Sequence, residues 1–162
     1  MIEKSHNGGV IILMSFVIAY MLMAIPLPDW AANWRPAWVA IVLIYWCLAL
    51  PERVGVGIAW VAGMFLDVQQ GTVFGQNAIV LIVIAFVILK LHKRIRVYPL
   101  AQQAMIICGL LLITQLLTLW IRAMMGFPPQ HWTYWMPAFT SMLLWPWLFI
   151  ILRDVRRTFR VY

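Results

Sequence analysis

Apolar residues fall into six long runs, separated by short segments that contain proline, glycine or charged residues. Runs of this length with few charges are typical of helices that lie in lipid or in a buried core. The clearest run lies between Pro36 and Pro51, since proline is poorly tolerated inside a helix. The pattern predicts helices at about residues 8–25, 37–50, 56–68, 74–91, 100–125 and 137–152.

The composition decides what surrounds these helices. Of 162 residues, 65% are hydrophobic and 10% are charged, whereas a soluble domain has roughly a quarter charged residues. So few charges cannot cover a water-exposed surface. We therefore expect an all-α membrane protein. Its six transmembrane helices would form one bundle, a single polytopic domain over residues 1–162. The first run is interpreted as an uncleaved helix because no A-x-A cleavage pattern follows it.

The basic residues predict the orientation. Six spans place both ends and two loops on one side, where ten of the twelve Lys and Arg residues lie; Arg35 and Arg122 are on the other side. By the positive-inside rule both termini are cytoplasmic. The net charge of +7 is therefore a topology signal that also attracts anionic lipids, and nucleic-acid binding is disfavoured. A re-entrant hairpin formed by the third and fourth helices would give the same count and stays open.

A row of small residues marks the third predicted helix. Every fourth position from Gly55 to Gly75 is small or acidic, and side chains four apart share one helix face. The row consists of Gly55, Ala59, Gly63, Asp67, Gly71 and Gly75. Such rows let membrane helices approach closely, so we expect a packing face, either for a partner helix or within the chain. Gly71 and Gly75 have a second interpretation, as turn residues before the next helix.

Asp67 is an acid inside an apolar segment, where an ionisable group requires a partner or a function. Arg35 and Arg122 are the basic residues on its side, so we expect Asp67 to pair with one of them. Arg122 also continues a polar face with Gln115 and Thr118, at helical spacing. Asp67, Arg35, Gln115 and Arg122 are therefore candidates either for a ligand site or for a buried structural pair or helix cap.

The sixth predicted helix contains Trp145-Pro146-Trp147. Pro146 removes a backbone donor and predicts a kink. Thr140 and Ser141, in the turn beneath, could satisfy the freed backbone groups. The two rings suit helix packing or a partner interface, and an ordinary kinked span with lipid-facing rings is the alternative.

No catalytic motif is found, and we expect neither enzymatic activity nor a cofactor. Cys47 and Cys108 lie in apolar runs and are interpreted as small buried residues rather than a disulfide. His6, His92 and His131 are far apart, so no metal site is expected.

Three strings carry a resemblance to a known family: RPAWVAIVLIYWCLALPERVGVG (35–57), GMFLDVQQGTVFG (63–75) and LLWPWLFIILRDVRRTF (143–159). The chain resembles the MreD family of the bacterial rod-shape machinery. The resemblance implies a bacterial inner-membrane protein that binds MreC directly and works beside MreB, RodA and a penicillin-binding transpeptidase in side-wall peptidoglycan synthesis. It also implies a span arrangement similar to the substrate-binding subunits of energy-coupling-factor transporters, and it leaves a homo-oligomer open.

Two functions are therefore expected to compete. The first is a non-enzymatic assembly protein whose small residues and aromatic anchors hold MreC. The second is a small-molecule-binding or transporter subunit with a cavity near Asp67, Arg122 and Gln115.

Overall fold

Helices make up most of the described chain, and no strand occurs in it. The structure is a computed structural model that describes residues 6–32, 34–71, 75–126 and 132–159, with the side chains of 6, 7, 132 and 133 excluded. The elements in order are α1 (His6–Ala24), α2 (Asp29–Ala32), α3 (Trp38–Ala49), α4 (Val56–Gln70), α5 (Gln76–Ile95), α6 (Leu100–Met124), the 3-10 helix η1 (Trp132–Trp135) and α7 (Met136–Thr158).

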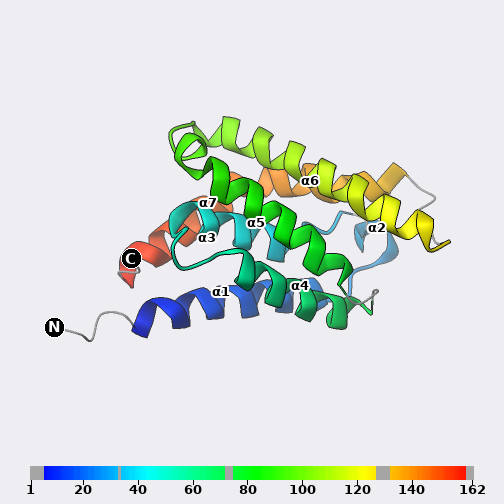
Figure 1. The fold of residues 1–162 in the computed structure, drawn as a ribbon, viewed down its shortest axis with the longest axis horizontal. Helices are drawn as coiled ribbons and strands as arrows, with labels where there is room; N and C mark the ends of the chain where they lie inside the picture. The colour runs from blue at the N-terminus through cyan, green and yellow to red at the C-terminus, as the bar shows by residue number, and fades with distance from the viewer. Residues whose placement is uncertain (1–5, 33, 72–74, 127–131, 160–162) are drawn as a thin grey trace.

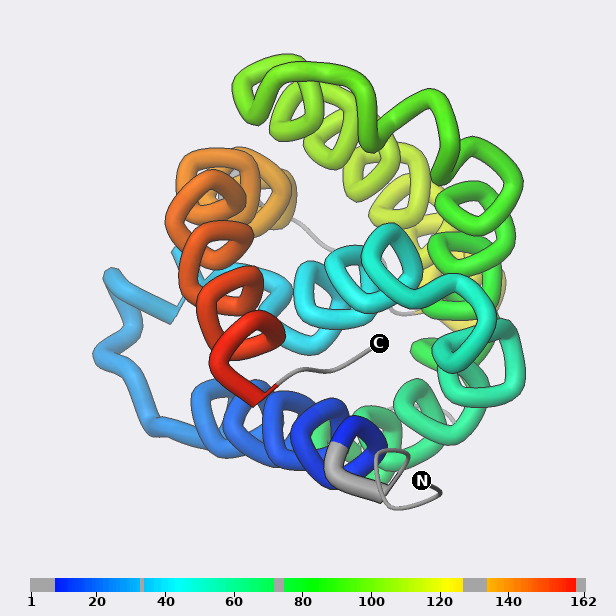
Figure 2. Tube along the Cα trace, turned by 90° about the vertical axis from the view of Figure 1, so that its left-hand side faces the viewer, coloured from blue at the N-terminus to red at the C-terminus, as the bar shows by residue number. Residues whose placement is uncertain are grey.

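The short helix α3 forms the centre of the molecule. Figure 2 shows α3 in the middle, with the longer helices around it. Every residue from Val39 to Leu48 is buried, and α3 packs against α1, α5 and α7. A helix that is hydrophobic on all sides is stable only when it is enclosed, and the run between Pro36 and Pro51 meets that condition.

Side chains from neighbouring helices satisfy both ends of α3. At its start, the main-chain N–H of Ala37 donates to Ser141 Oγ on α7 at 3.0 Å. At its end, the guanidinium of Arg96 donates to the carbonyl oxygens of Leu48 (2.5 Å) and Ala49 (3.0 Å). The terminal N–H and C=O groups of a helix have no partner within the helix, so these contacts complete α3 and fix its position along the bundle.

The long helices run back and forth along the long axis, so that α1 begins and α7 ends at the same end of the molecule (Figure 1). We call this the basic end. Its described basic residues are Arg53, Lys90, Lys93, Arg94, Arg96, Arg153, Arg156 and Arg157. Arg35 and Arg122 lie toward the opposite end, while Lys4 and Arg160 are outside the described residues.

Large apolar side chains cover the exterior of the peripheral helices. Examples with more than half of their surface exposed are Leu13, Phe65, Phe86, Met105, Trp120, Leu143 and Trp147. Two of the described helices, α6 and α7, are long and apolar enough by length and composition to cross a membrane, and residues 8–24 and α3 are shorter apolar helices. An exterior of this kind is typical of a surface that contacts lipid or another protein.

The predicted all-helical fold is confirmed, with differences at the helix ends. The structure extends α5 to Ile95 and α7 to Thr158, where the sequence pattern predicted ends near Leu91 and Leu152. Basic side chains near a helix C-terminus interact favourably with the helix dipole, so these two helices continue past their apolar parts. The elements α2 and η1 were not predicted.

Candidate functional site

The middle of the small-residue row is a contact between α4 and α5. Ala59 and Gly63 are buried there. A methyl group placed on Gly63 would lie 2.5 Å from the backbone nitrogen of Ala78 and 2.8 Å from the carbonyl carbon of Asn77. The two backbones therefore approach as closely as glycine allows, and this part of the row is occupied by the chain itself. Gly55 caps the start of α4 in an extended conformation and has open space around it.

Asp67 is 1% exposed and binds the start of α5. Its carboxylate oxygens accept hydrogen bonds from the main-chain N–H groups of Gly75 and Asn77, both at 2.8 Å. Carboxylates stabilise helix N-termini through the unpaired N–H groups and the helix dipole. In the described part of the chain, no ion pair joins Asp67 to Arg35 or Arg122, because the start of α5 supplies these donors instead, so the predicted pairing is wrong.

Gly71 and Gly75 are turn residues between α4 and α5. Their φ angles are +65° and +101°, in the left-handed region that favours glycine. The N–H of Gly71 donates back to the carbonyl oxygen of Asp67 and ends α4. The alternative interpretation of these two glycines describes them better than the packing one.

The residues of the Trp-Pro-Trp motif have different environments. Trp145 is fully buried, and its Nε1 donates to Gln103 Oε1 on α6 at 3.3 Å. Trp147 is 72% exposed on the outside of α7. Pro146 lies within α7, which continues through it. Ser141, expected to satisfy groups freed by Pro146, instead accepts the N–H of Ala37, and Thr140 Oγ1 donates to the carbonyl oxygen of Met136.

Sequence reasoning missed Gln103, which joins three helices. Its Nε2 donates to the carbonyl oxygens of Ile95 (2.9 Å) and Tyr98 (3.2 Å), and its Oε1 accepts from Trp145. A buried amide must satisfy its donors and its acceptor, and this one does so across the α5–α6 turn and α7. Its polar character near the start of an apolar helix was the available signal.

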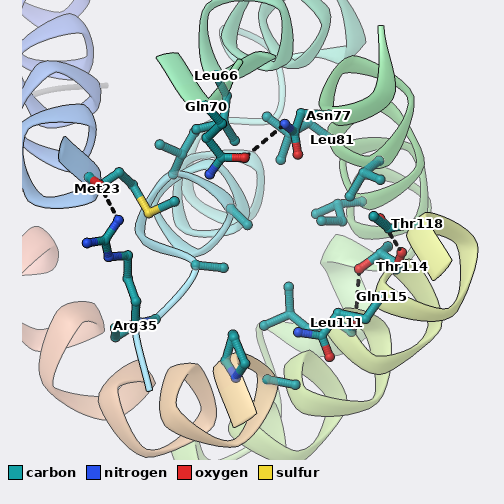
Figure 3. Close-up of a pocket in the computed structure, with 18 of the residues that line it drawn as sticks. Met23, Arg35, Leu66, Gln70, Asn77, Leu81, Leu111, Thr114, Gln115 and Thr118 are labelled. Atoms are coloured by element: carbon teal, nitrogen blue, oxygen red, sulfur yellow. Dashed lines mark hydrogen bonds between the residues drawn. The ribbon is translucent and has the colours of Figure 1, made fainter. Parts of the chain in front are cut away.

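A cavity of about 340 Å³ brings together three of the predicted polar candidates. Arg35, before α3, and Gln115 and Arg122, on α6, line it together with Thr118. Figure 3 shows Arg35 on one side of the cavity, Thr114 and Gln115 across from it, and Gln70 and Asn77 on a third side. Asp67 is absent from the lining, so the cavity expected near Asp67 forms without it, because its carboxylate faces α5.

Arg35 links this cavity to the end of α1. Its Nη1 donates to the carbonyl oxygen of Met23 at 2.7 Å and its Nη2 to that of Ile25 at 2.5 Å. Its Nε is buried and has no hydrogen-bond partner in the described part of the structure. The guanidinium therefore completes the C-terminal end of α1 with neutral acceptors, which leave its charge uncompensated.

Arg122 lies over the ring of Tyr134, with Cζ 5.9 Å from the ring centroid. The Tyr134 hydroxyl donates to the carbonyl oxygen of Gln115 at 2.7 Å. Burial raises the pKa of this hydroxyl above its ordinary value, although the nearby Arg122 opposes the shift, so it stays protonated as a donor. A cation over an aromatic face is attracted by the ring quadrupole, which positions Arg122 at the cavity.

The remaining candidate chemistry is sparse. Cys47 and Cys108 are buried and free, which confirms their interpretation as small apolar residues. His92 Nδ1 lies 2.5 Å from the carbonyl oxygen of Leu89 at the end of α5, while the side chains of His6 and His131 are outside the described residues. No group of three potential metal-ligating side chains occurs among the residues that were described.

These features define a small all-helical protein with an apolar exterior, of the kind found in membranes. Residues 4–155 match the family described as rod shape-determining protein MreD, and the chain belongs to the MreD family. It is 33% identical, over 151 residues, to the rod shape-determining protein MreD of Haemophilus influenzae (strain ATCC 51907 / DSM 11121 / KW20 / Rd), covering 93% of each chain. No solved structure matches the chain.

Proposed function

We propose that the chain is a non-enzymatic, multi-pass inner-membrane subunit of the bacterial elongation complex that binds MreC and helps to organise side-wall peptidoglycan synthesis. Membership of a rod shape-determining family supports the pathway. The apolar exterior supports a membrane location. In this proposal the six helices other than α2 and η1 cross the bilayer, and the basic end faces the cytoplasm.

We place the MreC-binding surface on α7. The small-residue row of α4, the first candidate for a partner helix, is occupied at Gly63 by α5. Residues four apart on α7 instead form an exposed line of large apolar side chains, namely Phe139, Leu143, Trp147 and Ile151. This line, which we call the α7 ridge, is the observation that carries the proposal, because tryptophan, here Trp147, is enriched among the few residues that dominate the energy of protein interfaces.

The other members of the complex are assigned by side. The basic end would meet cytoplasmic components such as MreB and anionic lipids. The opposite end and the α7 ridge would lie near MreC, RodA and the penicillin-binding transpeptidase. The family is known for shape determination and brings no catalytic residue to this chain.

Co-purification with MreC tests the α7 ridge. Trp147→Ala removes a ring that is 72% exposed, and Trp120→Ala on α6 removes one that is 64% exposed, so the two variants lose similar side chains from similar settings. We expect Trp147→Ala and Leu143→Ala to reduce the MreC recovered per chain roughly tenfold or more, as interface anchors do. Trp120→Ala should leave recovery unchanged.

Expression and melting temperature are measured alongside as controls for folding. Neither should change, because both tryptophans are exposed. Equal recovery of MreC with Trp147→Ala and Trp120→Ala would move the interface away from α7. Loss of MreC in every exposed-residue variant would point to a general dependence on lipid contact instead.

A further inference from the structure

The cavity between α1, α3, α4, α5, α6 and the start of α7 has the size and walls of a ligand site. Its volume of about 340 Å³ lies in the range of small-molecule pockets, which is roughly 300–1,000 Å³. Its inner wall is apolar and includes Val39, Leu66, Leu81, Ile84 and Leu111. A few polar side chains on three sides, among them Arg35, Gln115 and Asn77, complete the lining (Figure 3). An apolar wall with a small number of polar groups is typical of sites that orient a largely apolar ligand.

The charged side chains that line this cavity are all positive. Arg35 and Arg122 are the charged residues in the lining as described, and no carboxylate belongs to it. Arg35 is held by carbonyl oxygens and Arg122 by an aromatic ring, so neither contact neutralises a guanidinium. Positive charge in an apolar setting is costly until an anion compensates it.

A second hollow of about 580 Å³ borders the same two arginines. It shares Met23, Arg35, Gln70 and Arg122 with the first cavity. Arg35 and Arg122, which are 87 positions apart in the sequence, thus border both spaces. A ligand in the inner cavity would place its head group at this shared border.

One further atom requires a partner. Gln115 Oε1 is buried and has no hydrogen-bond partner among the described residues, and its side chain lines the cavity. An unsatisfied buried acceptor costs roughly 1–3 kcal/mol. A ligand that carries a hydroxyl or N–H group beside its anion would satisfy it.

We propose that this cavity binds an anionic amphiphile. Its phosphate or carboxylate head group lies between Arg35 and Arg122, a donor on it bonds Gln115 Oε1, and its apolar part packs on Leu66, Leu81 and Leu111. Arginine suits this role because its planar fork donates two hydrogen bonds to such an anion. The head group has two sources, a lipid of the surrounding leaflet or a free amphiphile. The site goes beyond MreC binding and does not depend on it.

The test uses the full chain in a neutral maltoside detergent, with monododecyl phosphate as the probe. A ligand that binds only the folded state raises the melting temperature by mass action, so a titration gives the apparent Kd. We expect a saturable rise for the unchanged chain. Arg94→Gln should give nearly the same apparent Kd, because seven other described basic residues share any surface attraction of anions at the basic end. For Arg122→Gln the apparent Kd should increase roughly tenfold to a hundredfold, the loss of a hydrogen bond to a charged group.

Two arms identify the source of the head group. Phosphatidylglycerol in nanodiscs, compared with phosphatidylcholine, tests a lipid, and inorganic phosphate tests the anion without a tail. Stabilisation by phosphatidylglycerol that Arg122→Gln abolishes and Arg94→Gln retains supports a lipid source. A response to monododecyl phosphate alone supports a free amphiphile.

Arg122→Gln could lower the melting temperature of the chain even without a probe. A second variant, which narrows the cavity by steric bulk, tests binding independently of this effect. Val80→Phe narrows the cavity from the half-buried wall of α5 without changing an arginine, and should weaken the probe similarly. The proposal is overturned when no probe raises the melting temperature of the unchanged chain. It is also overturned when Arg94→Gln weakens binding as much as Arg122→Gln, which would place the anion at the basic end. MreC co-purification is a separate readout, so either conclusion can fail alone.

Discussion

The Asp67 carboxylate on α4 accepts the main-chain N–H of Asn77, at the start of α5, at 2.8 Å. A second N–H, from Gly75, reaches the other carboxylate oxygen at the same distance. The side chain of Asp67 thus joins α4 to the start of α5 and fixes the position of one helix relative to the other. Asp67 serves here as a helix cap, a role that the sequence left open beside an arginine pair and a ligand site.

Substituting Asp67 tests this role. Asp67→Asn keeps one acceptor oxygen and should cost about 1 kcal/mol of unfolding free energy, whereas Asp67→Leu should cost about 3 kcal/mol because it leaves both donors unpaired. The melting temperature of the purified chain measures both. Asp154→Asn, at a largely exposed carboxylate, is the matched control and should have little effect. Equal losses in Asp67→Asn and Asp67→Leu would contradict a hydrogen-bonding role.

Gly63 and Gly109 form a second matched pair. Both are helical, but a methyl group at Gly63 would meet the backbone of α5 while one at Gly109 meets nothing within 4 Å. Gly63→Ala should destabilise the chain by about 1–3 kcal/mol through overpacking. Gly109→Ala should stabilise it by about 0.5–1 kcal/mol because alanine loses less entropy in a helix.

Thermal unfolding and the level of full-length protein distinguish the two glycine variants. MreC recovered per folded chain should not change in Gly63→Ala, since this position faces α5. A Gly63→Ala chain of normal stability that no longer recovers MreC would restore the small-residue row as a partner surface.

Gln103 and Gln102 are adjacent on α6, but only Gln103 is buried. Gln103→Leu leaves the carbonyl oxygens of Ile95 and Tyr98 and the Nε1 of Trp145 without this partner, so it should cost about 1–3 kcal/mol. Gln102→Leu removes an exposed amide and should be nearly neutral. Melting temperatures check both, and similar values for the two variants would show that the buried amide contributes little.

Local signals predicted most of the helix positions. Pro36 and Pro51 delimit α3, because proline restricts the backbone. A turn at Gly71 and Gly75 was one of two interpretations, but the helix expected from residue 74 begins only at Gln76. The helix ends at Ile95 and Thr158 were missed, since the apolar pattern stops where basic residues begin although the helix continues. The spacing of Gln115, Thr118 and Arg122 placed them on one face, and the cavity contains all three.

The partners of buried polar groups could not be predicted in this way. Asp67 was expected to meet an arginine because charge was the visible property, whereas the donors it uses are main-chain N–H groups that every residue carries. Gln103, Ser141 and Arg96 bond residues distant in sequence, so their roles depend on how the helices pack.

The enclosed position of α3 has a consequence for biosynthesis. The ribosome completes this helix before α4, α5, α6 and α7, so those four helices are not yet present to shield its surface. Its ten buried residues, Val39–Leu48, must remain against lipid or an insertion factor until the later helices arrive. Helix α7, which is made after these other helices, supplies Ser141 to the start of α3. A nascent chain released before α7 is made would therefore leave α3 incompletely enclosed.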